Sequence, residues 1–192
     1  MLTTELLLAE YSRGRFPMMH HPLPTSPGGG GGRLEWHDPD PRAIFPLDHI
    51  APNARLRTFI RTCGYRCTID QRFEEVMRAC ADRENTWINE EMIAAYVVLH
   101  TAGHALSVET WKDDDLIGGI YGARIGRAFF GESMFSRKSN ASKVAFYFLV
   151  DHLKTTGFTL FDTQYLNEHT ASLGAVEVTR EEFRRRLAAA IG

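Results

Sequence analysis

Apolar residues recur along this chain with the two periods that distinguish helices from strands. One segment carries a helical stripe, with apolar side chains at i, i+3, i+4 and i+7: Phe73, Val76, Met77 and Cys80. Asp70 precedes this stripe and is the expected N-cap of the helix. A second helix is expected after Asn89, whose side chain can cap it, and Gly103 is where it would end. Both helices should cover a buried surface.

Alternation of apolar and polar residues predicts strands in the middle of the chain. Segments 105–111, 116–123 and 127–134 alternate with a period of two and are joined by short turns, so they should form an antiparallel meander. A nearly all-apolar helix is expected next, ending near residue 153, and a last strand starts near residue 158. A helical connection between neighbouring strands predicts that they pair in parallel.

Two of these strands carry polar side chains on a face that is otherwise apolar. In the last strand, alternation places Asp162 and Gln164 on one face. In the third strand of the meander, Glu132 should share a face with Phe130 and Met134, which leaves a lone carboxylate among large apolar groups. A carboxylate in such surroundings needs a partner or a ligand. These residues are therefore the first candidates for chemistry.

Length and composition limit the number of domains. The chain has 192 residues, of which 44% are hydrophobic, and this is enough for one domain with a sizeable core and a small appendage. Residues 22–32 include three prolines and five successive glycines, so we expect a mobile loop there. We expect a small N-terminal domain over residues 1–52 and a larger domain over residues 53–192.

The sequence contains no recognisable targeting or metal-binding signal. The longest apolar runs are far shorter than the ~20 residues that span a bilayer, and no basic region precedes the N-terminal leucine run, so a cytoplasmic protein is expected. Three cysteines cannot form a closed set of disulfides, which suits a reducing compartment. Cys63 and Cys67 lack a second pair of zinc-type ligands, so no metal site is expected.

Two long polar motifs carry a family resemblance. GESMFSRKSNASK begins at Gly131, and FDTQYLNEHTASLGA begins at Phe161. Together they closely resemble the signature of the leucyl/phenylalanyl-tRNA protein transferases, bacterial enzymes that move an amino acid from charged tRNA onto a protein N-terminus. The resemblance extends upstream through HTAGHALSVETW, LIGGIYG, TWIN, WHDPDPRAIFP and YSRGRFPM, so it covers most of the chain. The glycine run at 28–32 departs from the family.

The resemblance implies a fold and a reaction. The family shares the core of the GCN5-related acyltransferase (GNAT) type, so we expect an α+β protein: a small N-terminal α+β unit followed by a GNAT-like domain with a mixed sheet. The implied activity is transfer of Leu or Phe, with Met as a third candidate, from charged tRNA to the N-terminal Lys or Arg of acceptor proteins. Such transfer would mark the acceptors for degradation in the N-degron pathway. A monomer with no membrane contact is expected, and no cofactor, because the tRNA ester is already activated.

The resemblance also assigns the chemistry to particular residues. Asp162 and Gln164 match the catalytic positions of the family, and their shared face agrees with joint action. A neutral amide is too weakly basic to remove a proton alone, so Gln164 is expected to accept a hydrogen bond from the attacking amine while Asp162 polarises and orients it. Glu132 matches the family's acidic residue and is expected to hold an ammonium group of either substrate. Without the family, Asp162 and Gln164 would merely end a strand.

Further substrate-binding residues follow from the resemblance alone. Trp36 and Trp87 are candidates for stacking on the terminal adenine, although the sequence by itself favours a core role for Trp36. Ser136 and Asn167 would position polar groups nearby. The pocket for the transferred side chain would be lined by apolar residues: Ile120, Phe129, Met134, Phe146, Leu149, Leu153 and Phe161.

Net charge limits how much RNA the chain can contact. A formal charge of -2 and a pI near 6.4 argue against wrapping a large tRNA surface, but they leave room for gripping the 3′ end. Residues 179–182, TREE, predict a capping box for a last helix. That helix carries Arg184, Arg185 and Arg186, which form either a solvated surface or a contact with tRNA phosphate.

Two other functions stay open on the sequence. An acyl-CoA dependent N-acyltransferase of the same fold would bind pyrophosphate at a glycine-rich turn before the helix. The segment here, SRKSNAS, has no glycine, and Ser139 or Asn140 is the expected helix cap. A non-catalytic adaptor that recognises protein N-termini would use the same acidic pocket. Only the presence of both Asp162 and Gln164 argues against it.

Overall fold

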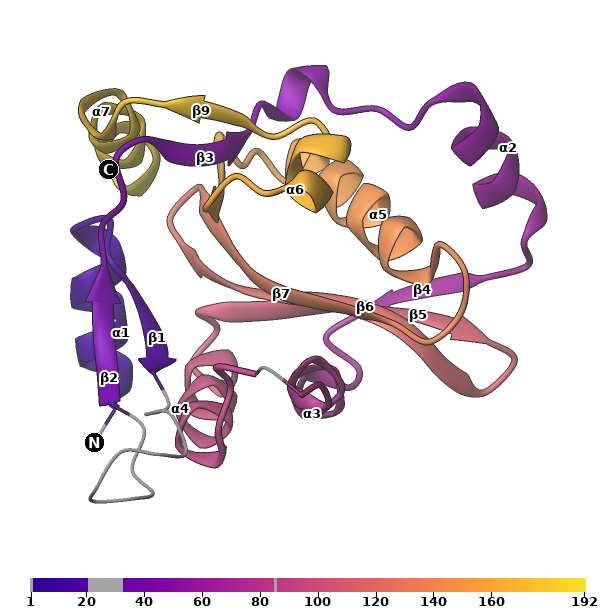
Figure 1. The fold of residues 1–192 in the computed structure, drawn as a ribbon, viewed down its shortest axis with the longest axis horizontal. Helices are drawn as coiled ribbons and strands as arrows, with labels where there is room; N and C mark the ends of the chain where they lie inside the picture. Colours follow the sequence, from indigo (N-terminus) through magenta and orange to yellow (C-terminus); the bar gives the residue numbers. More distant parts are fainter. Residues whose placement is uncertain (1, 21–32, 85) are drawn as a thin grey trace.

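Seven strands form a mixed sheet that carries helices on both faces (Figure 1). The computed structural model describes residues 2–20, 33–84 and 86–192. Across the sheet the strands follow one another in this order: β4 (Arg66–Ile69), β5 (Ala105–Lys112), β6 (Asp115–Ile125), β7 (Ala128–Ser136), β8 (Leu160–Gln164), β3 (Arg42–Phe45) and β9 (Val176–Val178). Neighbours are antiparallel except β7 and β8, which run parallel. The α+β class with a mixed sheet is therefore confirmed.

The helices form two groups, one on each face of the sheet (Figure 1). On one face, α5 (Ala141–Thr155) and the short 3-10 helix η1 (Leu47–His49) cover an apolar cluster. The other cluster is covered by four helices: α1 (Thr4–Ser12), α3 (Phe73–Ala81), α4 (Glu90–Thr101) and α7 (Arg180–Ile191). α6 (Glu168–Ser172) lies on the same side of the sheet as α5, and α2 (Ala54–Thr62) lies at the opposite end of the molecule from α1 (Figure 1). None of the helices in the described ranges is both long and apolar enough to cross a lipid bilayer.

The middle of the chain folds as its hydrophobic pattern predicts. β5, β6 and β7 form the antiparallel meander, and α5 connects β7 to the parallel strand β8, which is the order expected of an acyltransferase-like domain. The glycines of β6 allow close packing on both neighbours. A Cβ added at Gly118 would lie 2.7 Å from the Cβ of Ala141 at the start of α5, and one at Gly122 would lie 2.1 Å from the carbonyl oxygen of Phe130.

One predicted helix cap is wrong, and a second occupies the N-cap position without making the expected hydrogen bond. Asp70 has a φ of 57° and accepts a hydrogen bond from the backbone N–H of Ser107, so its side chain serves β5 instead of α3. Asn140 has a φ of 61° and makes no capping hydrogen bond. The hydroxyl of Ser136, at the end of β7, instead accepts from the backbone N–H of Ser142 in the first turn of α5. Asn89 does cap α4 through the N–H of Met92.

The N-terminal segment packs against the main sheet. α1, capped by Thr3, leads into the hairpin-like pair β1 (Phe16–His20) and β2 (Arg33–His37). β3 follows and pairs with both β8 and β9 in the seven-stranded sheet. The division near residue 52 stays a prediction. The glycine run at 28–32, for which a mobile loop was expected, lies outside the described residues.

The tail helix begins at the predicted cap but not with the predicted box. Thr179 accepts from the backbone N–H of Glu182, as expected. The carboxylate of Glu182 does not return that bond, because it is paired with Arg185 and Arg186. Arg184 is paired with Asp38. All three arginines thus have carboxylate partners within the protein.

Candidate active site

The candidate site lies where two parallel strands separate. β7 and β8 pair only at Ala128–Leu160, Phe129–Phe161 and Phe130–Asp162. Beyond these pairs the strands part, and a cavity of about 510 Å³ opens between them, within the usual size range of small-molecule sites. Its wall includes most of the second half of β7 and the end of β8, with further residues from β1, β3, β6 and the loops around them: Met18, Phe45, Arg83, Trp87, Ile120, Glu132, Ser133, Met134, Phe135, Ser136, Phe161, Thr163, Gln164, Tyr165, Asn167 and His169.

Glu132 occupies a β-bulge in the wall of this cavity. In the pairing of β6 with β7, Tyr121 faces Ser133 and Gly122 faces Gly131, so Glu132 is an extra residue. The bulge reverses the alternation of side chains. Phe130 therefore packs in the cluster under α1 and α4, while Met134 packs towards α5. The prediction that Phe130, Glu132 and Met134 share one face is wrong for this reason.

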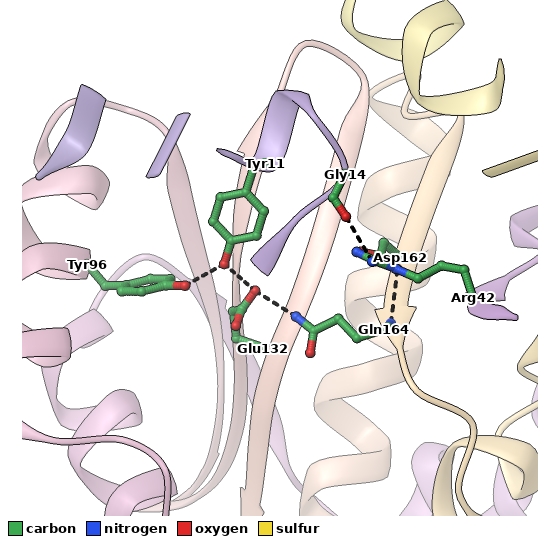
Figure 2. Close-up of polar contacts among 7 residues, drawn as sticks. All are labelled: Tyr11, Gly14, Arg42, Tyr96, Glu132, Asp162 and Gln164. Carbon is green, nitrogen blue, oxygen red and sulfur yellow. Dashed lines mark hydrogen bonds and ion pairs between the residues drawn. The ribbon is translucent and has the colours of Figure 1, made fainter. Parts of the chain in front are cut away.

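A chain of hydrogen bonds holds the Glu132 carboxylate (Figure 2). Tyr11 donates to Oε1 of Glu132 at 2.5 Å, and the Gln164 amide donates to the same oxygen at 2.9 Å. Because Tyr11 gives its only hydroxyl proton to Glu132, Tyr96 must donate to the Tyr11 oxygen. Oε2 of Glu132 is buried and has no partner within the described part of the chain.

Burial changes the proton affinity of this carboxyl. Removal from water raises the pKa of Glu132 from its ordinary value of 4.5 to about 8, while the hydrogen bonds from Tyr11 and Gln164 act in the opposite direction. The pKa values of Tyr11 and Tyr96 are also raised, first by burial and then by the charge of Glu132. Both tyrosines therefore stay protonated and act as hydrogen-bond donors at neutral pH.

Gln164 is fixed at the cavity wall in an unusual backbone conformation. Its φ is 69°, in the left-handed region that residues other than glycine seldom adopt. Its Nε2 donates to Glu132, and its Oε1 points away from Glu132 in Figure 2. A side-chain amide held this way presents a hydrogen-bond acceptor to whatever occupies the cavity.

Asp162 is not part of the cavity wall. It is fully buried, with 0% exposure, and its two oxygens accept from Nε and a terminal nitrogen of Arg42 at 2.8 and 2.6 Å. Gln164 turns out of the strand alternation through its positive φ, so the two side chains diverge (Figure 2). The expectation that Asp162 and Gln164 share one face of the strand is wrong, and of the two only Gln164 lines the cavity.

The apolar residues expected to line a side-chain pocket fall into two layers. Ile120, Met134 and Phe161 are part of the cavity wall. The others are fully buried behind it, in the core under α5: Phe129, Phe146, Leu149 and Leu153. Phe146 packs against both Phe45 and Phe161, with ring centroids 4.7 and 5.9 Å apart. It therefore supports two wall residues from behind.

The predicted polar and aromatic residues are also divided. Trp87, Ser136 and Asn167 line the cavity. Asn167 also caps α6 through the N–H of Thr170. Trp36 is half-buried on β2 against the apolar cluster under α1, outside the cavity wall, which agrees with the core role that the sequence alone favours.

Sequence reasoning missed residues that support or complete the site. Tyr11 and Arg42 lie in segments that carry the family resemblance, YSRGRFPM and WHDPDPRAIFP, but no chemistry was assigned to them. Tyr96 lies on the inward face of α4, which looked like core packing. Met18, Phe45 and Arg83 complete the cavity wall from segments distant in the sequence, and Tyr165 does so from the position after Gln164. No local pattern distinguishes them.

A basic surface lies on α2, outside the cavity wall. α2 carries Arg55, Arg57 and Arg61 with no acidic residue, and none of its residues is fully buried. The Tyr65 hydroxyl, just after α2, donates to the carbonyl of Ser139 at 3.5 Å, which ties this region to the loop that follows Ser136. In the described ranges, no group of three or more His, Cys, Asp or Glu side chains is placed to hold a metal ion.

The antiparallel meander, the connecting helix and a cavity where the next parallel strand separates define an acyltransferase-like α+β protein. The family model described as leucyl/phenylalanyl-tRNA protein transferase matches residues 44–188. The chain belongs to this family of transferases.

Two relatives bear the same description, leucyl/phenylalanyl-tRNA--protein transferase. The protein from Gloeobacter violaceus is 48% identical, with 99% of this chain and 94% of that one covered. The protein from Ruegeria pomeroyi is 50% identical, with 99% and 87% covered. Among solved structures, L-PGS from Bacillus licheniformis superposes with a TM-score of 0.46 and 15% identity, over 78% of this chain and 56% of that one.

Proposed function

We propose that this chain moves Leu, Phe or Met from the 3′ end of a charged tRNA onto the α-amine of proteins that begin with Lys or Arg. The observation that carries the proposal is the Gln164 amide, which Glu132 fixes in the wall of the cavity between β7 and β8. Membership of the transferase family supports the same activity. Transfer to such N-termini would mark the acceptors for degradation, and we expect the protein to act as a monomer.

The reaction requires alignment more than activation. The α-amine attacks the carbonyl carbon of the tRNA ester, an amide bond forms, the 3′ oxygen leaves, and the proton lost by the nitrogen ends on that oxygen. Oε1 of Gln164 accepts a hydrogen bond from the amine and holds its lone pair towards the ester. Glu132, which is part of the cavity wall, would make a second contact, to an amino or ammonium group of either substrate.

The tRNA end is proposed to bind across the cavity mouth. Trp87, in the wall, offers a surface for stacking on the terminal adenine. The basic surface of α2 would meet backbone phosphates farther along the strand, since its three arginines form no ion pair within the described part of the chain. A local basic surface of this kind fits a protein of net charge -2 that grips only part of a tRNA.

One experiment tests the proposal. Purified protein is incubated with labelled Leu-tRNA and a peptide that begins with Arg, next to a peptide of the same sequence that begins with Ala. Transfer of label to the Arg peptide at a much higher rate than to the Ala peptide supports the proposal. Binding of the Arg peptide without transfer would favour an adaptor, and acylation of that peptide from an acyl-CoA would favour the alternative enzyme class.

A further inference from the structure

The buried pair of Arg42 and Asp162 has no contact with the cavity, yet it is joined directly to Gln164. We infer that Asp162 and Arg42 are positioning residues, which hold the backbone of Gln164 in the left-handed conformation that aims its amide at the substrate amine. This inference rests on the proposed function, because it explains how the amide of that same site is aimed. In it, Asp162 acts on the backbone of Gln164, and Arg42 acts by fixing Asp162, a role that the sequence did not indicate.

A hydrogen bond joins the Asp162 side chain to the Gln164 backbone. Oδ1 of Asp162 accepts from the backbone N–H of Gln164 at 2.9 Å. This bond closes a tight local ring at the end of β8, where Gln164 has a φ of 69°. A left-handed residue that is not glycine is held only when its surroundings compensate for the strain. The Asp162 carboxylate supplies that compensation.

Arg42 fixes the Asp162 side chain. Arg42 contacts both carboxylate oxygens in a bidentate pair, and both side chains have 0% exposure. Arg42 is in turn fixed on three sides. It donates to the carbonyl oxygen of Gly14 at 2.9 Å, and its guanidinium lies 4.7 Å from the ring centroid of Phe16 and 4.4 Å from that of Phe183.

Asp162 is separated from the substrate in this arrangement. Its charge is neutralised by Arg42 and shielded from the cavity, so it has no path to the proton of a substrate amine. Its remaining influence on Gln164 is the bond to the N–H. The aim of the amide therefore depends on segments far apart in the chain: the end of α1, β1, β3, β8 and α7.

Two substitutions at Asp162 separate position from charge. Asp162→Asn keeps an oxygen that can accept from the Gln164 N–H, whereas Asp162→Leu has a similar size and no acceptor. We expect kcat for leucyl transfer to fall by about tenfold in the Asn variant, because the hydrogen bonds to Arg42 are weakened. It should fall by at least about a hundredfold in the Leu variant, because the Gln164 amide is then misplaced. The KM for Leu-tRNA should stay within about twofold of the wild type in both.

A structural readout accompanies the kinetics. Amide hydrogen exchange of Gln164, followed by NMR in the full-length protein, should stay slow in Asp162→Asn and become fast in Asp162→Leu. Arg42→Lys keeps the charge but loses the planar fork, so it should speed exchange at Gln164 and lower kcat while leaving the KM for Leu-tRNA unchanged. Arg78→Lys is the matched control, because Arg78 forms a similar pair with Glu90 on the surface and should change neither quantity.

Met77→Ala is the control for a general loss of stability, because it removes a fully buried side chain of α3 that does not line the cavity. If this variant loses kcat as strongly as Asp162→Leu at equal stability, the positioning role is refuted. It is also refuted if Asp162→Asn is as inactive as Asp162→Leu while its Gln164 N–H exchanges as slowly as in the wild type, since charge would then be what matters. Absence of transfer by the wild-type protein would overturn the proposed function itself, while the exchange measurement would still test the contact.

Discussion

Gln164 and Glu132 face each other across the gap where β8 leaves β7, joined by a hydrogen bond of 2.9 Å from the amide to the carboxylate. The unusual backbone geometry of each residue brings its side chain to the other. The bulge at Glu132 turns its carboxylate towards Tyr11 and Gln164, and the positive φ at Gln164 brings its amide to that carboxylate. This side-chain hydrogen bond links β7 and β8 beyond the point where their backbone pairing ends.

The raised pKa of Glu132 predicts a pH dependence of stability. A carboxyl whose pKa is about 8 in the folded protein and 4.5 in its ordinary state binds its proton more tightly when folded. Its contribution to stability is therefore complete below pH 4.5 and is lost as the pH rises through 8, by up to about 1.4 kcal/mol for each pH unit in that window. We expect the free energy of unfolding of the wild type, minus that of Glu132→Gln, to fall from pH 5.5 to pH 8. Urea unfolding across this range measures it, and a constant difference would contradict the assignment.

Removal of the Tyr11 hydroxyl should weaken the protein at the same carboxylate. Tyr11→Phe deletes the donor to Oε1 of Glu132 and leaves the Tyr96 hydroxyl without its acceptor, at a cost of about 1–3 kcal/mol. Because that hydrogen bond lowers the pKa of Glu132, its loss should raise this pKa further. Denaturant unfolding at pH 6 measures the cost, with Tyr147→Phe as the control on the half-buried face of α5. Equal stability of the two variants would refute a role for the Tyr11 bond.

The arginines of α2 should act on tRNA and not on the chemistry. Replacement of Arg55, Arg57 and Arg61 by Ala removes up to three phosphate contacts, so the KM for Leu-tRNA should rise and the slope of log KM against log salt should fall by up to about 2. Transfer from leucyl-adenosine, which has no phosphate, should be unaffected. Alanine at Arg184, Arg185 and Arg186, which are paired with carboxylates of the protein, is the matched triple variant and should have a much smaller effect. Similar slopes in the two triple variants would refute the assignment.

The ring of Phe146 should tune which side chain is transferred. Phe146→Ala leaves a void behind Phe45 and Phe161, at a cost of about 3–5 kcal/mol in stability. Phe45 and Phe161 can then move into the void, which enlarges the cavity for the larger phenylalanine side chain. The ratio of kcat/KM for Phe-tRNA to that for Leu-tRNA should therefore rise by about tenfold. Leu153→Ala is the control, because Leu153 is equally buried in the same core and does not line the cavity. A ratio that is unchanged, or that changes as much in the control, would exclude Phe146 as a determinant.

The sequence predicts well where local pattern determines structure. The meander, α5 and the parallel strand β8 follow from periods of two and 3.6 and from the helical connection. Gln164, Glu132 and Trp87 are also found at the cavity, as the resemblance implied. The bulge at Glu132 was not predictable, because one extra residue in a strand leaves no mark on composition yet puts Phe130 and Met134 on opposite faces.

Contacts between distant segments explain the other differences. The partner of Asp162 is 120 residues away in the chain, and the partner of Glu132 on α1 is 121 residues away. No periodic pattern indicates such pairs. The sequence therefore predicted Asp162 as a residue of the site, and it indicated no role for Arg42 beyond its place in a motif. The buried residues behind the cavity wall, such as Phe146 and Leu149, were likewise expected to line the cavity. Strand and helix patterns do not distinguish residues of a cavity wall from the core residues that support it.

In the proposed reaction, the Gln164 amide, held by Glu132, aligns the attacking amine. This role can be measured by single-turnover transfer of leucine from labelled Leu-tRNA to an Arg peptide, compared between the wild type and Gln164→Ala. We expect the rate of the chemical step to fall by at least about a hundredfold, with affinities for Leu-tRNA and for the peptide within about twofold of the wild type. A Gln164→Ala protein that transfers leucine at the wild-type rate would contradict the account.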